Sequence, residues 1–293
     1  MTLVDVRSSR KLDSRTSSPL RYPGGKAKLA GFFADALEAA GMRNATYVEP
    51  FAGGAGAGLT LLLAGVVGQV VINDLDPAVH SFWEAVKNES DEFARRIETV
   101  PLDLNEWQKQ REIYRAADAR DPFALGFAFF YLNRTNRSGV LHAGVIGGKS
   151  QSGTYRIDAR FNRVELQRRV KELGRVSDRI ELTFEDGRRS VERWATRSNT
   201  FLYVDPPYVE AGGSLYLNAF DARDHADLAA TLNKVSRSAW LLTYDDSPVI
   251  RNLYADRAVF DYELHYSAHR VGKAREVLIA SDPLIDWVNL NRA

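Results

Sequence analysis

The chain has 293 residues, of which 45% are hydrophobic and 26% are charged, a composition typical of a folded, water-soluble protein. It contains no cysteine, which excludes a disulfide scaffold, a cysteine-ligated metal site and a thiol nucleophile. The 39 Lys and Arg residues nearly balance the 38 Asp and Glu residues, so the net charge of +1 does not by itself indicate a nucleic-acid partner.

The length and the apolar runs of the sequence indicate the number of domains and the kind of protein. The length is enough for roughly two domains, or for one domain with a large insertion. No run reaches the roughly 18 consecutive apolar residues that a membrane-spanning helix requires. Residues 1–18 carry four Lys and Arg residues without an apolar stretch behind them, so we expect a solvated, flexible terminus and not a signal peptide.

Short apolar runs that are typical of strands recur along most of the chain, and most are separated by helical stretches. We expect strands at residues 46–51, 69–73, 180–184, 200–204, 239–243, 258–262 and 277–280. This alternation predicts an α/β fold in which a mostly parallel, Rossmann-like sheet carries helices on both faces.

The alternation stops between residues 90 and 177. We expect helices there at residues 92–100, 105–117, 122–133 and 163–176, with an irregular Gly/Ser-rich segment over 138–160. We interpret residues 90–177 as an inserted, mainly helical domain. Residues 19–89 and 178–293 then form the main domain.

Positive charge is concentrated toward the end of the inserted segment and just beyond it. Residues 133–179 contain 11 Lys and Arg but four Asp and Glu, a local charge of +7. A solvated helix face explains part of this excess. Because basic residues also occupy the irregular loop, the pattern favours a surface for phosphate groups.

A glycine-rich turn, residues 49–58, follows the first strand. Small residues there allow a ligand to lie against the backbone at the carboxyl end of the strand. Asp74 closes the next strand, where its carboxylate can accept both hydroxyls of a ribose. The pattern fits any nucleoside cofactor, and a purely structural turn stays open. Leu59 stands where G-x-G-x-x-G needs its third glycine, which weakens the alternative of a NAD(P)-binding oxidoreductase.

The tetrapeptide Asp205-Pro206-Pro207-Tyr208 follows another strand. The two prolines stiffen the backbone, so Pro206 presents a fixed carbonyl next to a carboxylate and an aromatic ring. The carboxylate and the carbonyl together can accept both hydrogens of an exocyclic amine, while the ring that carries this amine stacks on Tyr208. We therefore expect these four residues to form the catalytic site.

In this order, the motifs resemble those of the Dam-type class of N6-adenine DNA methyltransferases, which use S-adenosylmethionine. The resemblance covers nearly the whole chain, from about residue 20 to residue 281. It rests on the segments 20–26 (LRYPGGK), 49–56 (EPFAGGAG), 73–74 (ND), 131–135 (YLNRT), 185–186 (ED), 205–208 (DPPY), 244–246 (YDD) and 275–278 (REVL).

The resemblance implies a role for each matching residue. Phe51, Gly53 and Gly56 line the cofactor, Asp74 binds its ribose and Asp186 its adenine amine. The motif at 20–26 closes over the methionine end of the cofactor, with the side chains Tyr22 and Lys26. The product is S-adenosylhomocysteine, and we expect no metal.

The inserted domain of this family recognises DNA, so the resemblance implies double-stranded DNA as the partner. We expect contacts from the basic residues Arg134, Arg137, Lys149, Arg156 and Arg160. The segment after Asn133 departs from the Gly-Asn-Gly-Leu-x-Arg pattern of the GATC-methylating members, so we carry over no GATC specificity.

Several alternatives and a cellular setting complete the prediction. Methylation of cytosine N4 in DNA, or of adenine in RNA, stays open as an alternative reaction. A nucleic-acid-binding protein that catalyses no reaction is a further alternative. The family implies a cytoplasmic enzyme of a bacterial or phage-infected cell, and it leaves a cognate restriction endonuclease open as a partner.

Overall fold

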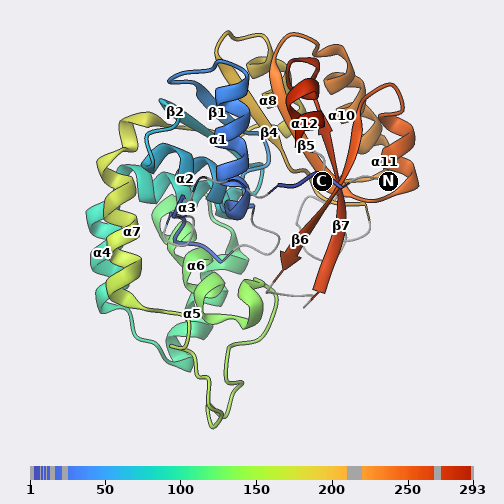
Figure 1. Ribbon diagram of the computed structural model, residues 1–293. Helices are drawn as coiled ribbons and strands as arrows, with labels where there is room; N and C mark the ends of the chain where they lie inside the picture. Colours follow the sequence, from blue (N-terminus) through green and yellow to red (C-terminus); the bar gives the residue numbers. More distant parts are fainter. Residues whose placement is uncertain are drawn as a thin grey trace.

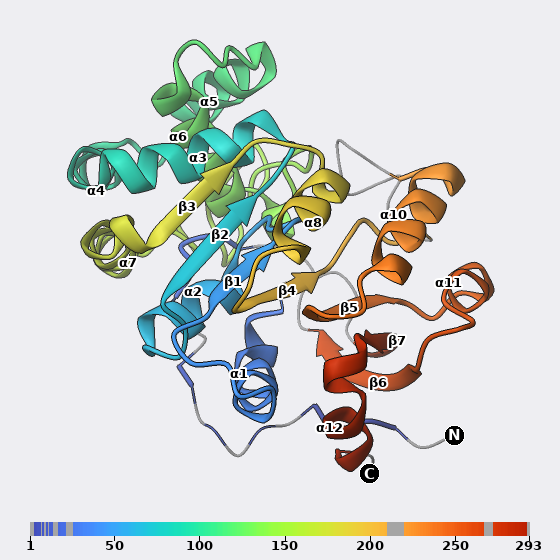
Figure 2. The same cartoon turned by 90° about the horizontal axis from the view of Figure 1, so that it is seen from above.

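A central sheet organises the molecule (Figures 1 and 2). The computed structural model describes residues 3–6, 8, 10, 12–13, 17–21, 26–209, 220–266 and 272–291. Within these residues, seven strands form one sheet in the order β3-β2-β1-β4-β5-β7-β6. The strands are β1 (Thr46–Glu49), β2 (Gln69–Asn73), β3 (Ile180–Thr183), β4 (Thr200–Val204), β5 (Ala239–Asp245), β6 (Val259–Tyr266) and β7 (Gly272–Ala280).

Strands β1 to β5 run parallel, and β7 lies antiparallel to both of its neighbours. The chain builds outward from β1 to β2 and β3 and then returns to place β4 on the other side of β1. This reversal creates a switch point between β1 and β4, and open parallel sheets bind ligands outside the carboxyl ends of the strands at such a point.

Successive strand residues point to opposite faces and fill two cores. Tyr47 and Phe201 belong to one core, while Val48 and Leu202 belong to the other. The first face is covered by α1 (Ala30–Ala39), α2 (Gly56–Leu63) and α12 (Ile285–Leu290). The second is covered by α8 (Gly187–Ala195), α10 (Ala222–Lys234) and α11 (Pro248–Leu253). The prediction of an α/β sheet with helices on both faces is confirmed.

A helical layer lies beside the sheet. It consists of α3 (Pro77–Asn88), α4 (Ser90–Thr99), α5 (Leu104–Ala116), α6 (Pro122–Thr135) and α7 (Arg163–Arg175). Helix α6 packs closely on α3, since a Cβ at Gly126 would lie 2.5 Å from the carbonyl oxygen of Ser81. The segment between α6 and α7 projects furthest from the sheet, at the lower edge of Figure 1. The division into a main and an inserted domain stays a prediction.

Four short 3-10 turns connect the longer elements in the described part of the chain. The turns are η1 (Ala27–Leu29), η2 (Arg137–Gly139), η3 (Ser177–Arg179) and η4 (Asp282–Leu284). In the part of the chain that the structure describes, no helix is long and apolar enough to cross a membrane.

The start of the chain, which we expected to be solvated, lies partly on the sheet. Val4 is buried, and its N–H donates to the carbonyl oxygen of Asp261 on β6 at 2.8 Å. Further along, the Arg10 guanidinium contacts Asp35 at 2.7 Å and also Glu38, both on α1. The apolar side chain of Val4 gains burial at the sheet edge, and composition alone did not reveal this contact.

Candidate active site

The turn between β1 and α2 forms one wall of the site. Gly53 has a φ of +46°, a conformation that glycine adopts at little steric cost. Its N–H donates to Asp74 Oδ2 at 2.8 Å, and its carbonyl oxygen accepts a hydrogen bond from the Trp83 indole at 2.9 Å. These bonds fix the turn to β2 and α3, so that Gly53 and Gly56 line a cavity with bare backbone.

Asn73, the last residue of β2, ties the ends of three strands together. Its Nδ2 donates to the carbonyl oxygens of Pro50 and Glu185 at 2.8 and 2.9 Å. Its Oδ1 accepts from the Thr183 hydroxyl at 2.8 Å and from the Glu185 N–H at 3.1 Å. The bonds hold the loops after β1, β2 and β3 at a common edge. The Asn-Asp pair was noticed in the sequence, but this structural role was not assigned to it.

Asp74 faces the cavity from the end of β2. Burial raises its pKa to about 6, although N–H donors from Asp76 and Gly53 work in the opposite direction. Asp76 in turn caps α3, because its carboxylate accepts from the Ala78 N–H at 2.8 Å. The Gly53 and Asp76 N–H groups therefore fix the orientation of the Asp74 carboxylate, which is mostly ionised at neutral pH and can accept hydrogen bonds.

Asp186 and Phe51 meet at one end of the cavity. Asp186 caps α8 and pairs with the Arg188 guanidinium at 2.6 Å, and this hydrogen-bonded pair lowers the pKa of Asp186. A Cβ at Gly187 would lie 2.3 Å from the Phe51 ring. The same ring packs edge-on against Phe220 at 5.5 Å between centroids. An aromatic surface thus lies beside a carboxylate.

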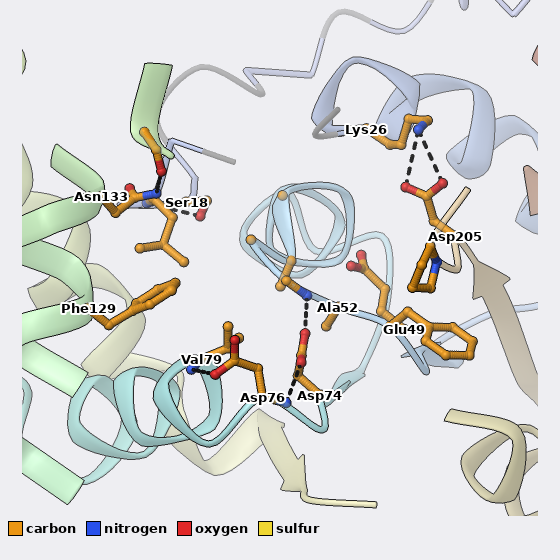
Figure 3. A pocket seen from close by; sticks show the side chains of 18 of the residues that line it. Ser18, Lys26, Glu49, Ala52, Asp74, Asp76, Val79, Phe129, Asn133 and Asp205 are labelled. Carbon is orange, nitrogen blue, oxygen red and sulfur yellow. Dashed lines mark hydrogen bonds and ion pairs between the residues drawn. The ribbon is translucent and has the colours of Figure 1, made fainter. Parts of the chain in front are cut away.

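These side chains share one cavity of about 400 Å³, a size within the usual range for small-molecule sites (Figure 3). It is lined by the predicted residues Lys26, Phe51, Gly53, Gly56, Asp74, Asp186, Asp205 and Pro207. Helix α6 and the loop after it close the opposite side through Phe129, Asn133, Leu141 and His142. The predicted cofactor residue Tyr22 lies outside the described residues.

Asp205 lies at the carboxyl end of β4, where the predicted tetrapeptide begins. Its Oδ1 accepts from the Thr243 hydroxyl at 2.9 Å and from the Tyr208 hydroxyl at 3.2 Å. Thr243, on β5, is itself hydrogen-bonded to the Tyr203 hydroxyl at 2.8 Å. Tyr208 belongs to the predicted tetrapeptide, whereas Thr243 and Tyr203 were not singled out from the sequence. The rotamer of Asp205 is thereby fixed toward the cavity.

Lys26 is buried next to this carboxylate. Its Nζ lies 3.2 Å from each Asp205 oxygen and donates to the Tyr208 hydroxyl at 2.7 Å. A second buried carboxylate, Glu276 on β7, lies 3.7 Å from the same Nζ and accepts a hydrogen bond from Tyr262. The segment containing Glu276 was noticed only as a weak motif. The predicted place of Lys26 at the methionine end of the cofactor stays a prediction.

Glu49 contributes another buried carboxyl to the cavity. Its Oε1 accepts from the Gly58 N–H at 2.8 Å. Burial raises the pKa of Glu49 to about 8, and the negative charge of Asp205 adds to this rise. Glu49 is therefore mostly protonated at neutral pH. Sequence reasoning placed it in a motif but gave it no role.

Asn133 on α6 binds the segment that leads to Lys26. Its Oδ1 accepts from the Arg21 N–H, and its Nδ2 donates to the Arg21 carbonyl oxygen, each at 2.8 Å. The same Nδ2 lies 3.2 Å from the Gly139 carbonyl oxygen. Asn133 therefore docks the backbone before the site onto the helical layer.

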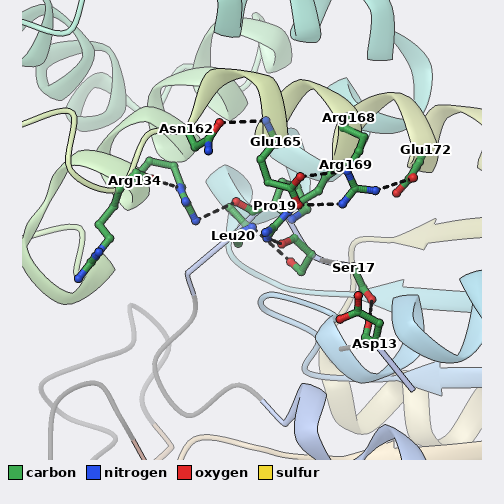
Figure 4. A network of polar contacts seen from close by, with 12 residues as sticks. Asp13, Ser17, Pro19, Leu20, Arg134, Asn162, Glu165, Arg168, Arg169 and Glu172 are labelled. Carbon is green, nitrogen blue, oxygen red and sulfur yellow. Dashed lines mark hydrogen bonds and ion pairs between the residues drawn. The ribbon is translucent and has the colours of Figure 1, made fainter. Parts of the chain in front are cut away.

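Arg134 holds the same segment from the next position of α6 (Figure 4). Its guanidinium donates to the carbonyl oxygens of Arg160 and Pro19, at 2.8 and 3.5 Å. Burial lowers the pKa of Arg134 to about 9, and the charges of Arg21, Arg169 and Arg160 lower it further. Several cations thus gather around carbonyl acceptors.

The remaining predicted DNA-contact residues lie on the projecting segment between α6 and α7. Arg137, Lys149, Arg156 and Arg160 are exposed. The Arg160 guanidinium lies over the Tyr155 ring, 5.7 Å from its centroid. The structure therefore brings Arg134 and Arg160 together and leaves the others on the loop. Among the described residues, no group of three or more His, Asp or Glu side chains is arranged to hold a metal ion.

Comparison with known proteins gives the family. The similar solved structures include an rRNA methyltransferase, aviRa from Streptomyces viridochromogenes, with 17% identity, a TM-score of 0.43, and coverage of 95% of this chain and 96% of that chain. A Pyrococcus horikoshii protein assigned as an RNA methyltransferase has 9% identity, a TM-score of 0.39, and coverage of 94% and 91%. A search of curated proteins finds no match. The model of the D12 class N6 adenine-specific DNA methyltransferases matches residues 22–276, and the chain belongs to that family.

Proposed function

We propose that this enzyme transfers a methyl group from S-adenosylmethionine to N6 of an adenine that is flipped out of double-stranded DNA at a specific sequence. The observation that carries the proposal is the position of Asp205. Its carboxylate lies where the cavity reaches the switch point of the sheet, between β1 and β4. Membership of the family implies adenine as the base and DNA as the substrate.

The cavity fits the cofactor in the chemistry of its lining. Asp74 presents an acceptor for ribose hydroxyls, while Phe51 and Asp186 offer a ring and a carboxylate for an adenine. Bare backbone at Gly53 leaves room between them. When bound, S-adenosylmethionine supplies the activated methyl group.

The target amine is a poor nucleophile because its lone pair is delocalised into the purine. Asp205 and the carbonyl oxygen of Pro206 are the acceptors proposed for its two hydrogens. Both bonds favour a pyramidal nitrogen whose lone pair points toward the methyl group. Such positioning supplies the main catalytic effect, since near-attack orientation is worth roughly 7–11 kcal/mol. A fixed carboxylate also stabilises a nitrogen that becomes positive.

An adenine within a duplex cannot reach Asp205, so the base must leave the helix. Extrusion costs a few kcal/mol in stacking and pairing. The Tyr208 ring lies beside Asp205 and is the surface proposed to stack on the extruded base. Residues 210–217, which could close over the base, lie outside the described residues. Pro207, which also lines the cavity, supports the same path.

The basic segment between α6 and α7 is proposed to hold the DNA. Arg137, Lys149, Arg156 and Arg160 are exposed there, as phosphate or base contacts require. The logarithm of DNA affinity falls with the logarithm of salt concentration, and each phosphate contact that is lost makes this slope less steep by about 0.9. Replacing Lys149 and Arg156 by alanine should therefore flatten the slope by nearly two units. An unchanged slope would refute contact by these two residues.

Methylation of unmethylated genomic DNA, read by modification-sensitive long-read sequencing, tests the reaction. We expect N6-methyladenine in one short motif with the unmutated enzyme and no mark with Asp205→Ala. The matched control is Asp178→Ala, an exposed aspartate outside the cavity, which should leave the mark intact. N4-methylcytosine would correct the base, and a mark made by Asp205→Ala would refute its catalytic role.

The proposal extends to the cellular setting. A DNA methyltransferase works where the chromosome or the phage genome lies, which is the cytoplasm of a bacterial cell. A cognate restriction endonuclease is the proposed protein partner. DNA carrying the methylated motif should resist cleavage by that endonuclease, whereas unmethylated DNA should be cut. Equal cleavage of both would remove the endonuclease from the proposal.

A further inference from the structure

The Lys26 ammonium occupies the space that the proposed function gives to the target amine. Its Nζ contacts both oxygens of Asp205 at 3.2 Å and donates to the Tyr208 hydroxyl at 2.7 Å. It also lies 5.0 Å from the centroid of the Tyr208 ring, as a cation over a π face does. Two nitrogen donors, one from Lys26 and one from the base, thus require the same acceptor.

Displacement of Lys26 needs a second place for its charge. Lys26 is 6% exposed, and a buried ammonium without a partner is costly. Glu276 is 2% exposed and its Oε2 lies 3.7 Å from Lys26 Nζ. It stands on β7, paired in register with Asp245 on β5. A small movement of the ammonium therefore exchanges one carboxylate for the other without exposing the charge to water.

We propose that Glu276 is a positioning residue that receives Lys26 when the target base enters. The inference rests on the proposed function, because it takes Asp205 as the acceptor of the adenine amine. Before entry, Lys26 neutralises Asp205 and keeps the site ordered. During entry, its ammonium shifts toward Glu276, and the Asp205 carboxylate becomes available to one of the two N6 hydrogens. No covalent bond and no proton is exchanged in this step.

Tyr262 sets how strongly Glu276 competes for the ammonium. Its hydroxyl donates to Glu276 Oε2, the oxygen that also lies nearest to Lys26. The same oxygen of Glu276 therefore accepts a hydrogen bond from Tyr262 and forms an ion pair with Lys26. Removal of the hydroxyl should leave Glu276 a better acceptor for Lys26. The pair Glu276→Gln and Tyr262→Phe consequently changes the competition in opposite directions, while each keeps the shape of its side chain.

A double-mutant cycle tests the proposal. The single-turnover methylation rate is measured at saturating cofactor for the unmutated enzyme, Glu276→Gln, Lys26→Met and the double variant. Glu276→Gln should slow the step by roughly tenfold to a hundredfold, which lies within the range of coupling between contacting residues. In the Lys26→Met background the same change should have little effect, since no ammonium remains to be received. Tyr262→Phe should react at least as fast as the unmutated enzyme.

A binding measurement gives a readout that does not need turnover. Duplexes are compared that carry adenine or purine, which lacks the 6-amino group, at the target position. The unmutated enzyme should prefer adenine, and Glu276→Gln should lose most of that preference while its affinity for S-adenosylmethionine stays within about twofold. The matched control is Glu181→Gln, a carboxylate on β3 that does not line the cavity, and it should behave like the unmutated enzyme.

The outcomes separate this proposal from the proposed function. Equal slowing by Glu276→Gln with and without Lys26→Met, or an unchanged rate when Glu276→Gln is made in the enzyme that retains Lys26, would overturn the role of Glu276. Slower reaction by Tyr262→Phe would do the same. Failure of the unmutated enzyme to methylate adenine would instead refute the proposed function.

Discussion

Glu49 offers a test in which stability and pH are linked. Its carboxyl is buried at the end of β1, and burial raises its pKa from 4.5 to about 8. Between pH 4.5 and pH 8, Glu49 therefore keeps its proton in the folded protein, whereas it has lost this proton in the unfolded chain. Stability contributed by this group is present below pH 4.5 and is lost as pH rises toward 8, by about 1.4 kcal/mol per pH unit.

The perturbation is Glu49→Gln, which keeps an oxygen to accept from the Gly58 N–H but removes the titration. At pH 5 the wild-type side chain is close to its neutral form when folded, so the two proteins should differ little in pH-linked stability. Between pH 5 and pH 7 the difference in unfolding free energy should grow by about 2.5 kcal/mol in favour of the variant. A shift of this size is large against typical total stabilities of roughly 5–15 kcal/mol.

Urea unfolding of the cofactor-free proteins at pH 5, 6 and 7 measures this difference. Asp74, whose pKa is raised to about 6 by burial, titrates in both proteins and cancels in the comparison. Glu98→Gln, at an exposed position of α4, is the matched control and should show no growing difference. A gap between wild type and Glu49→Gln that stays constant with pH would refute the argument that Glu49 is protonated in the folded state.

Two further predictions concern contacts at opposite ends of the cavity. Asn133→Ala removes the paired bonds to Arg21 and should lower the unfolding free energy by about 1–3 kcal/mol, as measured in urea, because partly buried backbone groups lose their partners. Asn133→Asp should lose less, and equal stability of all three proteins would contradict this. Gly187→Ala should weaken S-adenosylmethionine binding roughly tenfold in calorimetry, because a Cβ there displaces the Phe51 ring. Gly153→Ala, where the nearest atom to a new Cβ is 3.9 Å away, should bind normally, and normal binding by Gly187→Ala would count against the placement of the cofactor.

Periodicity and motifs predicted much of this fold because the strands are buried on both faces. The β-branched run at β2 and the apolar run at β4 have few alternatives to a central parallel strand, and both appear at the predicted residues. Helices α5 and α6 also lie where expected, each beginning at an aspartate cap. The chemistry at the carboxyl ends of the strands follows from this topology, so Asp74 and Asp205 fall on one cavity.

The parts that escaped prediction depend on contacts between segments far apart in the sequence. Glu276 meets Lys26 across 250 positions of the chain, and no local pattern encodes that distance. Thr243 supports Asp205 from a neighbouring strand, as an ordinary hydroxyl in a buried run. The backbone acceptors of Arg134 were equally invisible, because a basic residue in a basic segment is first expected to face solvent or phosphate.

The place where the helical layer joins the sheet has a consequence for how this architecture changes over time. The chain leaves the sheet after β2 and returns at β3, and these two strands are direct neighbours paired from Val70 with Ile180 onward. The exit at Asn73 and the entry at Ile180 therefore lie at opposite ends of two paired parallel strands, and the sheet itself fixes their separation. Loops between α6 and α7 can grow, shrink or be exchanged without stretching either crossing. The segment proposed to contact DNA can thus be replaced by grafting, while the sheet edge that carries Asp74 and Asp205 stays unchanged.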